Sequence, residues 1–516
     1  MSNFQGADLN LFILRWMVFL SGAAVMGIEM AASRLLRPFF GDSILIWANI
    51  IGLIMIYLTA GYFLGGRWAD RDPRPTTFYR ILAWAGFAIG VLPFIAKPFL
   101  DLAIPALEQF DAGLGFVSFA GTLALFVVPI TLLGCVSPFA IRLSTRDVSS
   151  SGSTAGNLYS LSTFGSIVGV FGTVFVLLAI FGTRGTYVAF SIALLASAIV
   201  GLARESRGRA LRYAILLAIV IALALFASSG IIKQSAGLVY ETESFYNFIQ
   251  VIDDGGWRLL TVNEGQAYQS AYRADRVLSG GIWDLFLIAP FFASHEPSTS
   301  SGQTPRNVLM IGLAAGTVAR AYTEIYPAIP IDGVELDPAI IAVGQNYFAM
   351  TQPNLTAIAG DGRAFMRRAG EYAVIAIDAY RQPYIPFHLT TVEFFRETRA
   401  HLAPRGVVAL NAARAPNDYR LVDALAATMR QVFPSVYLID HPNNANTLIV
   451  ATNEPTRLDD FRANVAVLRD PNLQIVAAQA LPSARVAEQI EPVFTDDHAP
   501  VENLINDIIF RYALGQ

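Results

Sequence analysis

Seven apolar stretches, each about as long as a helix that crosses a bilayer, occupy most of the first 230 residues of the chain. Their approximate limits are 11–31, 43–65, 78–97, 114–141, 156–181, 185–203 and 210–230. About 20 helical residues cross the hydrocarbon core, and a helix satisfies its own backbone polar groups there. The first stretch is no cleavable signal, because Glu29 and Arg34 follow it directly and a second stretch comes soon after. The sequence therefore predicts an α-helical transmembrane bundle of about seven spans over residues 1–234.

The composition excludes several classes of protein. Hydrophobic residues make up 54% of 516 residues, which is too apolar for a wholly soluble chain of this size. The net charge is only -4 and no basic run occurs, so nucleic-acid binding is not expected. Cys135 is the single cysteine, which rules out a disulfide framework. The five histidines lack metal-ligand spacing, and no metal is expected.

Small residues recur at helical spacing inside two of the apolar stretches. Gly61-x-x-x-Gly65 and Gly165-x-x-x-Gly169 each place glycines on one helix face, where backbones can approach closely. We expect both faces to be helix-packing contacts. Glu29 is different, because a carboxylate within a span is costly and usually has a function. Its structural alternatives are a pair with Arg34 or a position at the interface.

From about residue 238 the pattern changes to short apolar runs. Val239–Asp253 and Trp257–Glu264 flank an Asp-Asp-Gly-Gly turn, which predicts a β-hairpin. The apolar runs that follow, separated by amphipathic helices, indicate a mostly parallel sheet covered on both faces. These runs are Asn307–Gly312, Ile331–Glu335, Thr356–Ala359, Tyr372–Asp378, Gly406–Asn411, Val436–Asp440 and Thr447–Ala451. The predicted domains are therefore the transmembrane bundle at 1–234, a small β-hairpin domain at 235–293 and an α/β Rossmann-like domain at 294–516.

A glycine turn and an acid mark the expected ligand site of that domain. Gly312-Leu-Ala-Ala-Gly316 ends the first predicted strand and opens a helix, so its amides can face a ligand; a purely structural tight turn is the alternative. Glu335 ends the next strand, 23 positions after Gly312. An acid at that place typically accepts both ribose hydroxyls of a nucleotide.

Two further acids follow the next strands in the same way. Asp361, before Gly362, could take an adenine amino proton, with a helix N-cap as the alternative. Asp378 ends the fourth strand, beside the expected reacting carbon, where it could deprotonate or orient an amine. Capping of a following helix is the alternative for Asp378.

In this order, the motifs resemble a known family. Val334-Glu-Leu-Asp337, Gly360-Asp-Gly362 and Val374-Ile-Ala-Ile-Asp378, behind a β-hairpin, resemble the spermidine synthase (aminopropyltransferase) family over roughly 238–510. With the spans, the chain resembles bacterial membrane-fused spermidine synthase-like proteins. The resemblance implies a Rossmann-like methyltransferase/spermidine-synthase fold with an N-terminal β-domain. It also implies decarboxylated S-adenosylmethionine (or S-adenosylmethionine) as cosubstrate, no metal, and transfer of an aminopropyl group to an amine.

The resemblance also implies residue roles. Glu335 would hold ribose, Asp361 adenine, and Asp378 would activate the acceptor nitrogen, with Tyr380 as a second catalytic candidate. The remaining implied contacts are Gly312, Gly316, Gly362, Gln269 and Asn247 for the cosubstrate, and Tyr246, Arg381, Asp496 and Asp497 for the acceptor.

The chain departs from the family at the acceptor side. Ala315 stands where the family's turn carries an aspartate, Arg381 replaces a second aspartate, and Ile282–Asp284 replaces Tyr-His-Glu. An arginine near a cationic diamine costs about 1–4 kcal/mol of repulsion. Putrescine is therefore disfavoured unless Asp496 and Asp497 supply replacement carboxylates. Arg381 would instead suit an acceptor with a carboxylate or phosphate.

These residues leave three functions open. The first is a membrane-bound, aminopropyltransferase-like polyamine synthase. The second is an S-adenosylmethionine-dependent methyltransferase that acts on a membrane-associated substrate, such as a lipid-linked acceptor or a peptide. The third is a non-enzymatic membrane scaffold or transporter with a drifted synthase domain. Retention of Glu335, Asp361 and Asp378 together favours an enzyme, and a homodimer is expected by analogy alone.

The expected location is the bacterial cytoplasmic membrane, with conflicting signals for the face of the C-terminal domain. Loops after the second, fourth and sixth predicted spans carry ten arginines, against five basic residues opposite. The positive-inside rule then places this domain outside after seven spans. The cytosolic supply of adenosyl cosubstrates indicates the cytosol instead, and the sequence leaves both open.

Overall fold

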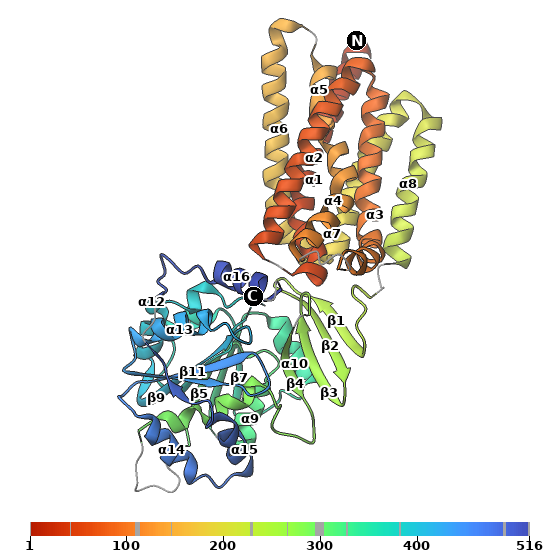
Figure 1. Ribbon diagram of the computed structural model, residues 1–516. Helices are drawn as coiled ribbons and strands as arrows, with labels where there is room; N and C mark the ends of the chain where they lie inside the picture. Colours follow the sequence, from red (N-terminus) through yellow and green to blue (C-terminus); the bar gives the residue numbers. More distant parts are fainter. Residues whose placement is uncertain are drawn as a thin grey trace. The chain divides into compact units, whose positions relative to one another are not determined.

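The chain divides into two compact units, Met1–Gln234 and Ser235–Gln516. The computed structural model describes residues 2–41, 43–108, 114–145, 147–227, 231–265, 267–294, 304–326, 329–380, 383–488 and 492–513. The first unit is helical and the second combines two sheets with helices (Figure 1). The further division of the second unit at residue 293 stays a prediction.

Long helices make up the first unit. They are α1 (Ser2–Phe40), α2 (Ile44–Arg71), α3 (Pro75–Glu108), α4 (Leu114–Gly134), α5 (Val136–Ser144), α6 (Ser151–Gly172), α7 (Leu178–Glu205) and α8 (Arg207–Phe226). A 3-10 turn, η1 (Val148–Ser150), precedes α6, and a π-helical segment, η2 (Thr173–Leu177), joins α6 to α7. Ser43 begins α2 as its N-cap, because its hydroxyl accepts the Ile46 N–H at 3.3 Å.

Six helices in the described part of the chain are long and apolar enough to cross a membrane. One of them, Val148–Glu205, has 58 residues and contains two predicted spans, 156–181 and 185–203. At 1.5 Å per residue it would be about 87 Å long, roughly three times the hydrocarbon core. Gly182 has φ +63 and ψ −171, so the helical backbone is broken between the two predicted spans. The count of seven spans stays a prediction.

The glycine faces predicted in the sequence are packing contacts, as expected. A Cβ at any of the four positions would come within 2.1–2.5 Å of a neighbouring helix. The nearest atoms are the Thr131 carbonyl for Gly61, the Cys135 Cα for Gly65, the Phe19 carbonyl for Gly165 and the Ala23 carbonyl for Gly169. The missing side chains therefore set the separation of α1 from α6 and of α2 from α4 and α5.

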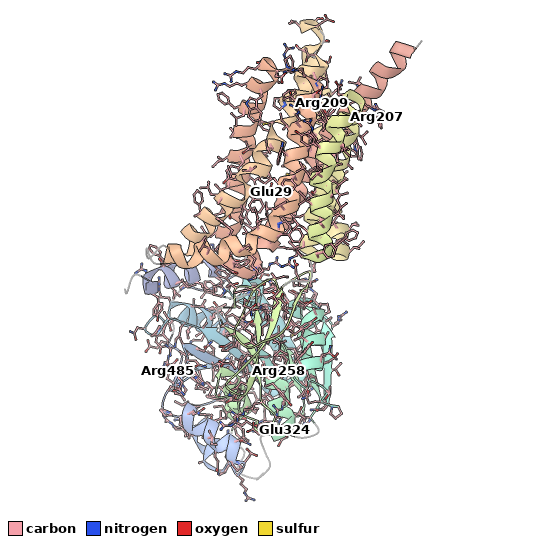
Figure 2. All side chains as sticks on the ribbon, turned by 90° about the vertical axis from the view of Figure 1, so that its right-hand side faces the viewer. Glu29, Arg207, Arg209, Arg258, Glu324 and Arg485 are labelled. Atoms are coloured by element: carbon pink, nitrogen blue, oxygen red, sulfur yellow. The ribbon has the colours of Figure 1, made fainter. Side chains whose placement is uncertain are left out.

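Glu29 lies inside the helical unit, with 7% of its surface exposed (Figure 2). Its two structural alternatives, a pair with Arg34 and a position at the interface, both stay predictions.

The second unit begins with a four-stranded antiparallel sheet in the order β1 (Leu238–Glu243), β2 (Phe248–Asp254), β3 (Trp257–Val262), β4 (Tyr268–Tyr272). The predicted hairpin is confirmed, since β2 pairs with β3 and Gly255 and Gly256 have φ +55 and +83. The predicted run Val239–Asp253 is wrong as one strand. It turns at Ser244, whose hydroxyl accepts the N–H groups of Tyr246 and Asn247 at 3.0 and 2.8 Å.

An eight-stranded sheet follows, in the order β12-β10-β11-β9-β8-β5-β6-β7. Its strands are β5 (Val308–Ile311), β6 (Ile331–Glu335), β7 (Leu355–Ala359), β8 (Tyr372–Ile377), β9 (Leu402–Ala413), β10 (Ser435–Asp440), β11 (Asn446–Thr452) and β12 (Arg485–Val486). From β7 to β9 the neighbours are parallel, as predicted, whereas β10, β11 and β12 join antiparallel. The strand order reverses at β5, where ligands bind in open α/β sheets.

Helices cover both faces of this sheet (Figure 1). Val308 and Met310 of β5 face a cluster with η3 (Ile282–Phe292), while Leu309 and Ile311 face a cluster with α12 (Val392–Ala400). Burial on both sides explains why these strands are continuously apolar. The other helices are α9 (Thr317–Ile325), α10 (Pro338–Tyr347), α11 (Gly362–Met366), η4 (Phe387–Leu389), α13 (Arg420–Arg430), α14 (Leu458–Ala466), α15 (Pro471–Ala480) and α16 (Val501–Ala513).

The small sheet packs on α10 and on the glycine turn that follows β5. Apolar residues of β2 and β3 form one cluster with Ile340 and Val343 of α10 and with Ala315 of the turn. Two hydrogen bonds hold β4 beside the turn after β5, one from the Ala315 N–H to the Ser270 hydroxyl and one from the Ala271 N–H to the Thr317 hydroxyl, each at 2.9 Å.

The close approach of α1 and α6 gives the first prediction. Gly165→Ala places a methyl group 2.1 Å from the Phe19 carbonyl oxygen. We expect it to lower the stability by about 1–3 kcal/mol. Gly156→Ala, in the same helix but with nothing within 4 Å, should be neutral or stabilising, because alanine favours helix by about 1 kcal/mol over glycine. Thermal unfolding of the detergent-solubilised variants measures both, and equal effects would contradict the packing.

Candidate active site

The glycine turn at the end of β5 lies against the backbone that follows β8. Gly312 and Gly316 have φ +90 and +85, which glycine adopts without strain. A Cβ on Gly312 would lie 2.4 Å from the Asp378 carbonyl oxygen, and one on Gly316 would lie 2.7 Å from the Met350 side chain. Only glycine allows this turn to approach Asp378 so closely.

The amides of the turn already donate to protein acceptors. Ala314 N–H donates to the Glu335 carboxylate at 2.9 Å and Ala315 N–H to the Ser270 hydroxyl at 2.9 Å. Gly312 N–H donates to the Val334 carbonyl at 2.9 Å. In this structure the turn therefore positions side chains, as in the tight-turn alternative. The assignment of Gly312 and Gly316 to a nucleotide stays a prediction.

Glu335 ends β6 as a buried carboxylate aimed by two backbone donors. Its Oε1 accepts the Asp337 N–H at 3.1 Å and its Oε2 the Ala314 N–H at 2.9 Å. Burial raises the pKa of Glu335 to about 7, while these hydrogen bonds oppose the shift. Each oxygen keeps acceptor capacity for a further donor.

Asp337 joins the two sheets, a role that the sequence did not reveal. It is fully buried and caps α10 by accepting the Ala339 N–H at 3.0 Å. Its other oxygen accepts from the Ser244 hydroxyl at 2.5 Å and the Asn247 amide at 2.9 Å. Asn247, predicted as a nucleotide contact, thus lies in the seam between the sheets with its amide on Asp337.

Gln269 occupies a β-bulge beside the glycine turn. Thr261 pairs with Tyr268 and Leu260 with Ser270, which leaves Gln269 as the extra residue of β4. Bulges re-aim a side chain. The Gln269 Nε2 is buried and has no hydrogen-bond partner in the described part of the chain, so it is a donor that lacks an acceptor.

Asp361 is a helix N-cap, as its structural alternative predicted, and it also remains accessible. Its Oδ1 accepts the Ala364 N–H at 2.7 Å. Its Oδ2 lies 3.3 Å from the His388 Nε2, and the side chain is 42% exposed. A Cβ on Gly362 would come within 2.4 Å of Ile311, so this glycine brings the turn close to the end of β5.

Asp378 follows β8 as a buried carboxylate between two neutral donors. Its Oδ2 accepts the Trp283 indole N–H at 3.0 Å and its Oδ1 the Asn411 amide at 2.8 Å. Burial raises the pKa of Asp378, and the two hydrogen bonds oppose the rise. The next helical element in the described part of the chain is η4, which begins only at Phe387, and the described acceptor contacts of Asp378 are those with Trp283 and Asn411, so it caps no helix among the described residues.

Tyr380 fixes the loop after Asp378 to β9. Its hydroxyl donates to the Asn411 carbonyl at 3.2 Å and accepts the Ala413 N–H at 2.7 Å. Burial raises the pKa of Tyr380 further above its usual range. This hydroxyl is engaged with the backbone, so Tyr380 positions the loop; its catalytic role stays a prediction.

The sequence did not identify Asn411 as a residue of this site. Its amide oxygen accepts from Asn446 at 3.0 Å while its nitrogen donates to Asp378. The available signal was a polar residue near the end of the apolar run of β9, and nothing in the sequence paired it with Asp378.

The structure does not show the residues predicted to contact the acceptor gathered around Asp378. Asp496 accepts from both Nη atoms of Arg363 at 2.8 Å, and this guanidinium lowers the pKa of Asp496. Asp497 is exposed on the same turn. The Tyr246 side chain is also exposed, and its ring centroid lies 5.3 Å from that of Phe245. Arg381 lies outside the described residues.

Comparison with known proteins shows which family the chain resembles. Residues 293–454 match the spermine/spermidine synthase domain. The chain is 30% identical over 220 residues to a polyamine aminopropyltransferase of Vibrio vulnificus, covering 41% of this chain and 71% of that protein. It is 29% identical over 315 residues to a probable polyamine aminopropyl transferase of Bifidobacterium longum, covering 56% and 68%. The crystal structure of a probable spermidine synthase from Corynebacterium glutamicum is 18% identical, covering 50% and 92%, with a TM-score of 0.39.

Proposed function

The chain belongs to the spermidine synthase-like family, a family of transferases, and we propose that its second unit transfers the aminopropyl group of decarboxylated S-adenosylmethionine to an amine. The observation that carries this proposal is the placement of Glu335 and Asp378. These two buried carboxylates end β6 and β8, on either side of the turn after β5.

The residues around the turn fit a nucleoside. Glu335 has both oxygens aimed by backbone donors, and their remaining lone pairs suit the two ribose hydroxyls. Gln269 offers a buried amide donor that lacks an acceptor in the described part of the chain. Asp361 keeps an accessible carboxylate, which suits the adenine amino group. We assign these three residues to the cosubstrate.

Asp378 is the proposed base. It takes a proton from the acceptor ammonium, and the freed nitrogen forms a bond to the sulfur-bound methylene carbon of the aminopropyl group. The carbon–sulfur bond breaks, its electron pair stays on sulfur, and methylthioadenosine leaves as a neutral thioether. A raised pKa brings the base closer to the operating pH, which favours proton transfer.

The helical unit is proposed to hold the enzyme in a membrane. The six long apolar helices of its described part expose many large apolar side chains, such as Phe63, Phe171 and Phe175, which a bilayer would cover. We expect the full chain to stay in the membrane pellet after an alkaline carbonate wash and to be released by detergent. A chain limited to residues 235–516 serves as the control and should be released by the wash. Release of the full chain would contradict membrane insertion.

A substitution of Asp378 separates binding from turnover. Asp378→Asn keeps the side-chain shape but cannot accept a proton, so we expect at least about a 100-fold loss of turnover. Affinity for methylthioadenosine should remain. Asp254→Asn, at the exposed β2–β3 turn, is the matched control. Product formation from decarboxylated S-adenosylmethionine and an amine measures turnover, and calorimetry measures binding.

Two results would contradict these assignments. Full turnover by Asp378→Asn would remove its role as the base. Formation of S-adenosylhomocysteine from S-adenosylmethionine, with no product from the decarboxylated compound, would instead establish a methyltransferase.

The raised pKa of Glu335 makes nucleoside binding depend on pH. Two hydroxyl donors favour the charged carboxylate, so the pKa of Glu335 must be lower in the complex than the value of about 7 in this structure. Affinity for methylthioadenosine should therefore be full above pH 7 and should weaken as the pH falls through 7, by up to about tenfold per pH unit. Glu335→Gln should abolish this dependence. Calorimetry at several pH values measures it, and a flat profile for the unsubstituted protein would contradict the ribose assignment.

A further inference from the structure

The carboxylate of Asp361 is contacted at both oxygens, although 42% of its side chain is exposed. Its Oδ1 accepts the Ala364 N–H at 2.7 Å, and its Oδ2 lies 3.3 Å from the His388 Nε2. The N-cap bond alone leaves the second oxygen loosely directed, because the terminal torsion of an aspartate is broad. An imidazole with a proton on Nε2 attracts that oxygen in its neutral and in its charged form. The histidine therefore fixes the direction of the second oxygen.

The backbone of His388 is anchored to the helix that Asp361 caps. Arg363, in α11, donates from its Nη1 to the His388 carbonyl at 3.0 Å. The Arg363 side chain is only 14% exposed, and its guanidinium also binds Glu397 and Asp496, with closest contacts at 2.8 Å. A guanidinium shared by two carboxylates in fork geometry has little freedom to move. Arg363 thus holds η4 beside α11, with the imidazole of His388 on Asp361.

The His388 ring also has an aromatic neighbour. The Phe387 ring meets it edge-on, with centroids 5.7 Å apart and an interplanar angle of 85°. The His388 side chain is 35% exposed. A ligand can therefore reach the carboxylate and the imidazole from solvent, whereas Arg363 behind them is largely buried.

A carboxylate with one fixed oxygen can distinguish purines by the group that they carry at position 6. Adenine presents an amino donor there, and a carboxylate is an acceptor only. Hypoxanthine presents a carbonyl oxygen, which is also an acceptor and is repelled. A site built to hydrogen-bond one group rejects an analogue that lacks it, because its own polar group is then left unpaired.

From these contacts we infer that His388 is a positioning residue, which holds Asp361 ready for the adenine amino group and makes the site select adenine. The inference rests on the proposed function, in which Asp361 contacts adenine. Because the imidazole restrains the carboxylate before the nucleoside arrives, binding does not have to order this side chain. His388 acts through Asp361 and takes no part in the transfer itself.

Two nucleosides that differ only at position 6 test the inference. Calorimetry on the full-length protein in detergent gives the dissociation constants of methylthioadenosine and methylthioinosine, and their ratio measures the preference for adenine. His388→Ala should lower this preference by about twofold to tenfold, the range expected when one side chain must be ordered on binding. The affinity for methylthioinosine should change by less than about twofold. A general distortion of the site would weaken both nucleosides equally and leave the ratio unchanged, which would overturn the inference.

Three further variants serve as controls. His388→Gln keeps an amide donor near the place of Nε2 and should retain most of the preference. His388→Phe keeps a flat ring without a donor, and it carries the same test if His388→Ala fails to fold. His401→Ala is the matched histidine control, because the His401 ring lies 3.2 Å from the Gly370 carbonyl oxygen and should leave the ratio unaffected. Equal loss of preference in His388→Gln and His388→Phe would overturn the inference, as would tighter binding of methylthioadenosine by His388→Ala.

Asp361→Asn separates the inference from the proposed function. Asparagine also caps helices, so the start of α11 should be kept. The amide no longer repels the carbonyl oxygen of methylthioinosine, so the preference should fall at least about tenfold. If Asp361→Asn leaves the preference unchanged, Asp361 does not contact adenine, and the assignment fails together with the inference. If Asp361→Asn lowers the preference and His388→Ala does not, only the inference fails.

Discussion

The contact between Gly312 and the Asp378 carbonyl is the constraint on which the site depends. A side chain at Gly312 would meet that oxygen at 2.4 Å, so the turn after β5 approaches the end of β8 only because the side chain is absent. Two residues further on, Ala314 donates to Glu335 at the end of β6. One short turn therefore sets the positions of both buried acids. The distance between the proposed nucleoside contact and the proposed base is a property of the backbone.

Four acids of the second unit differ in what balances their charge. Glu335 and Asp378 are buried and held by neutral donors, so burial raises the pKa of each. Asp496 and Asp440 face arginines and have lowered pKa values. Charge left without a partner in the protein is costly unless a ligand supplies the partner. This contrast supports the roles proposed for Glu335 and Asp378, whereas Asp284, also buried with a raised pKa, has its carboxylate taken up by Ser279 and Gly280.

The sequence predicted the parts of the fold that follow from periodicity and from short motifs. The apolar runs of β5, β6 and β8 and the acids that end them stand out because both faces of a parallel sheet are buried. It could not predict the Trp283–Asp378 bond, which joins residues 95 positions apart. It also could not place Asn247 on Asp337, since that contact depends on how the small sheet packs against α10. The turn at Ser244 was missed because a hydroxyl, and not glycine or proline, supports it.

The two units use glycine in different ways, and this explains why only one use was predicted fully. In the helical unit Gly165 lies within a regular helix. Its spacing from Gly169 predicts a helix face without side chains, so its role in helix packing follows from the sequence pattern alone. At the end of β5 Gly312 has φ +90, and its role depends on which strand lies beside it. A pattern of local spacing can predict the first kind of contact. The second requires the strand order, because β8 becomes the neighbour of β5 only after the chain has passed through β6 and β7.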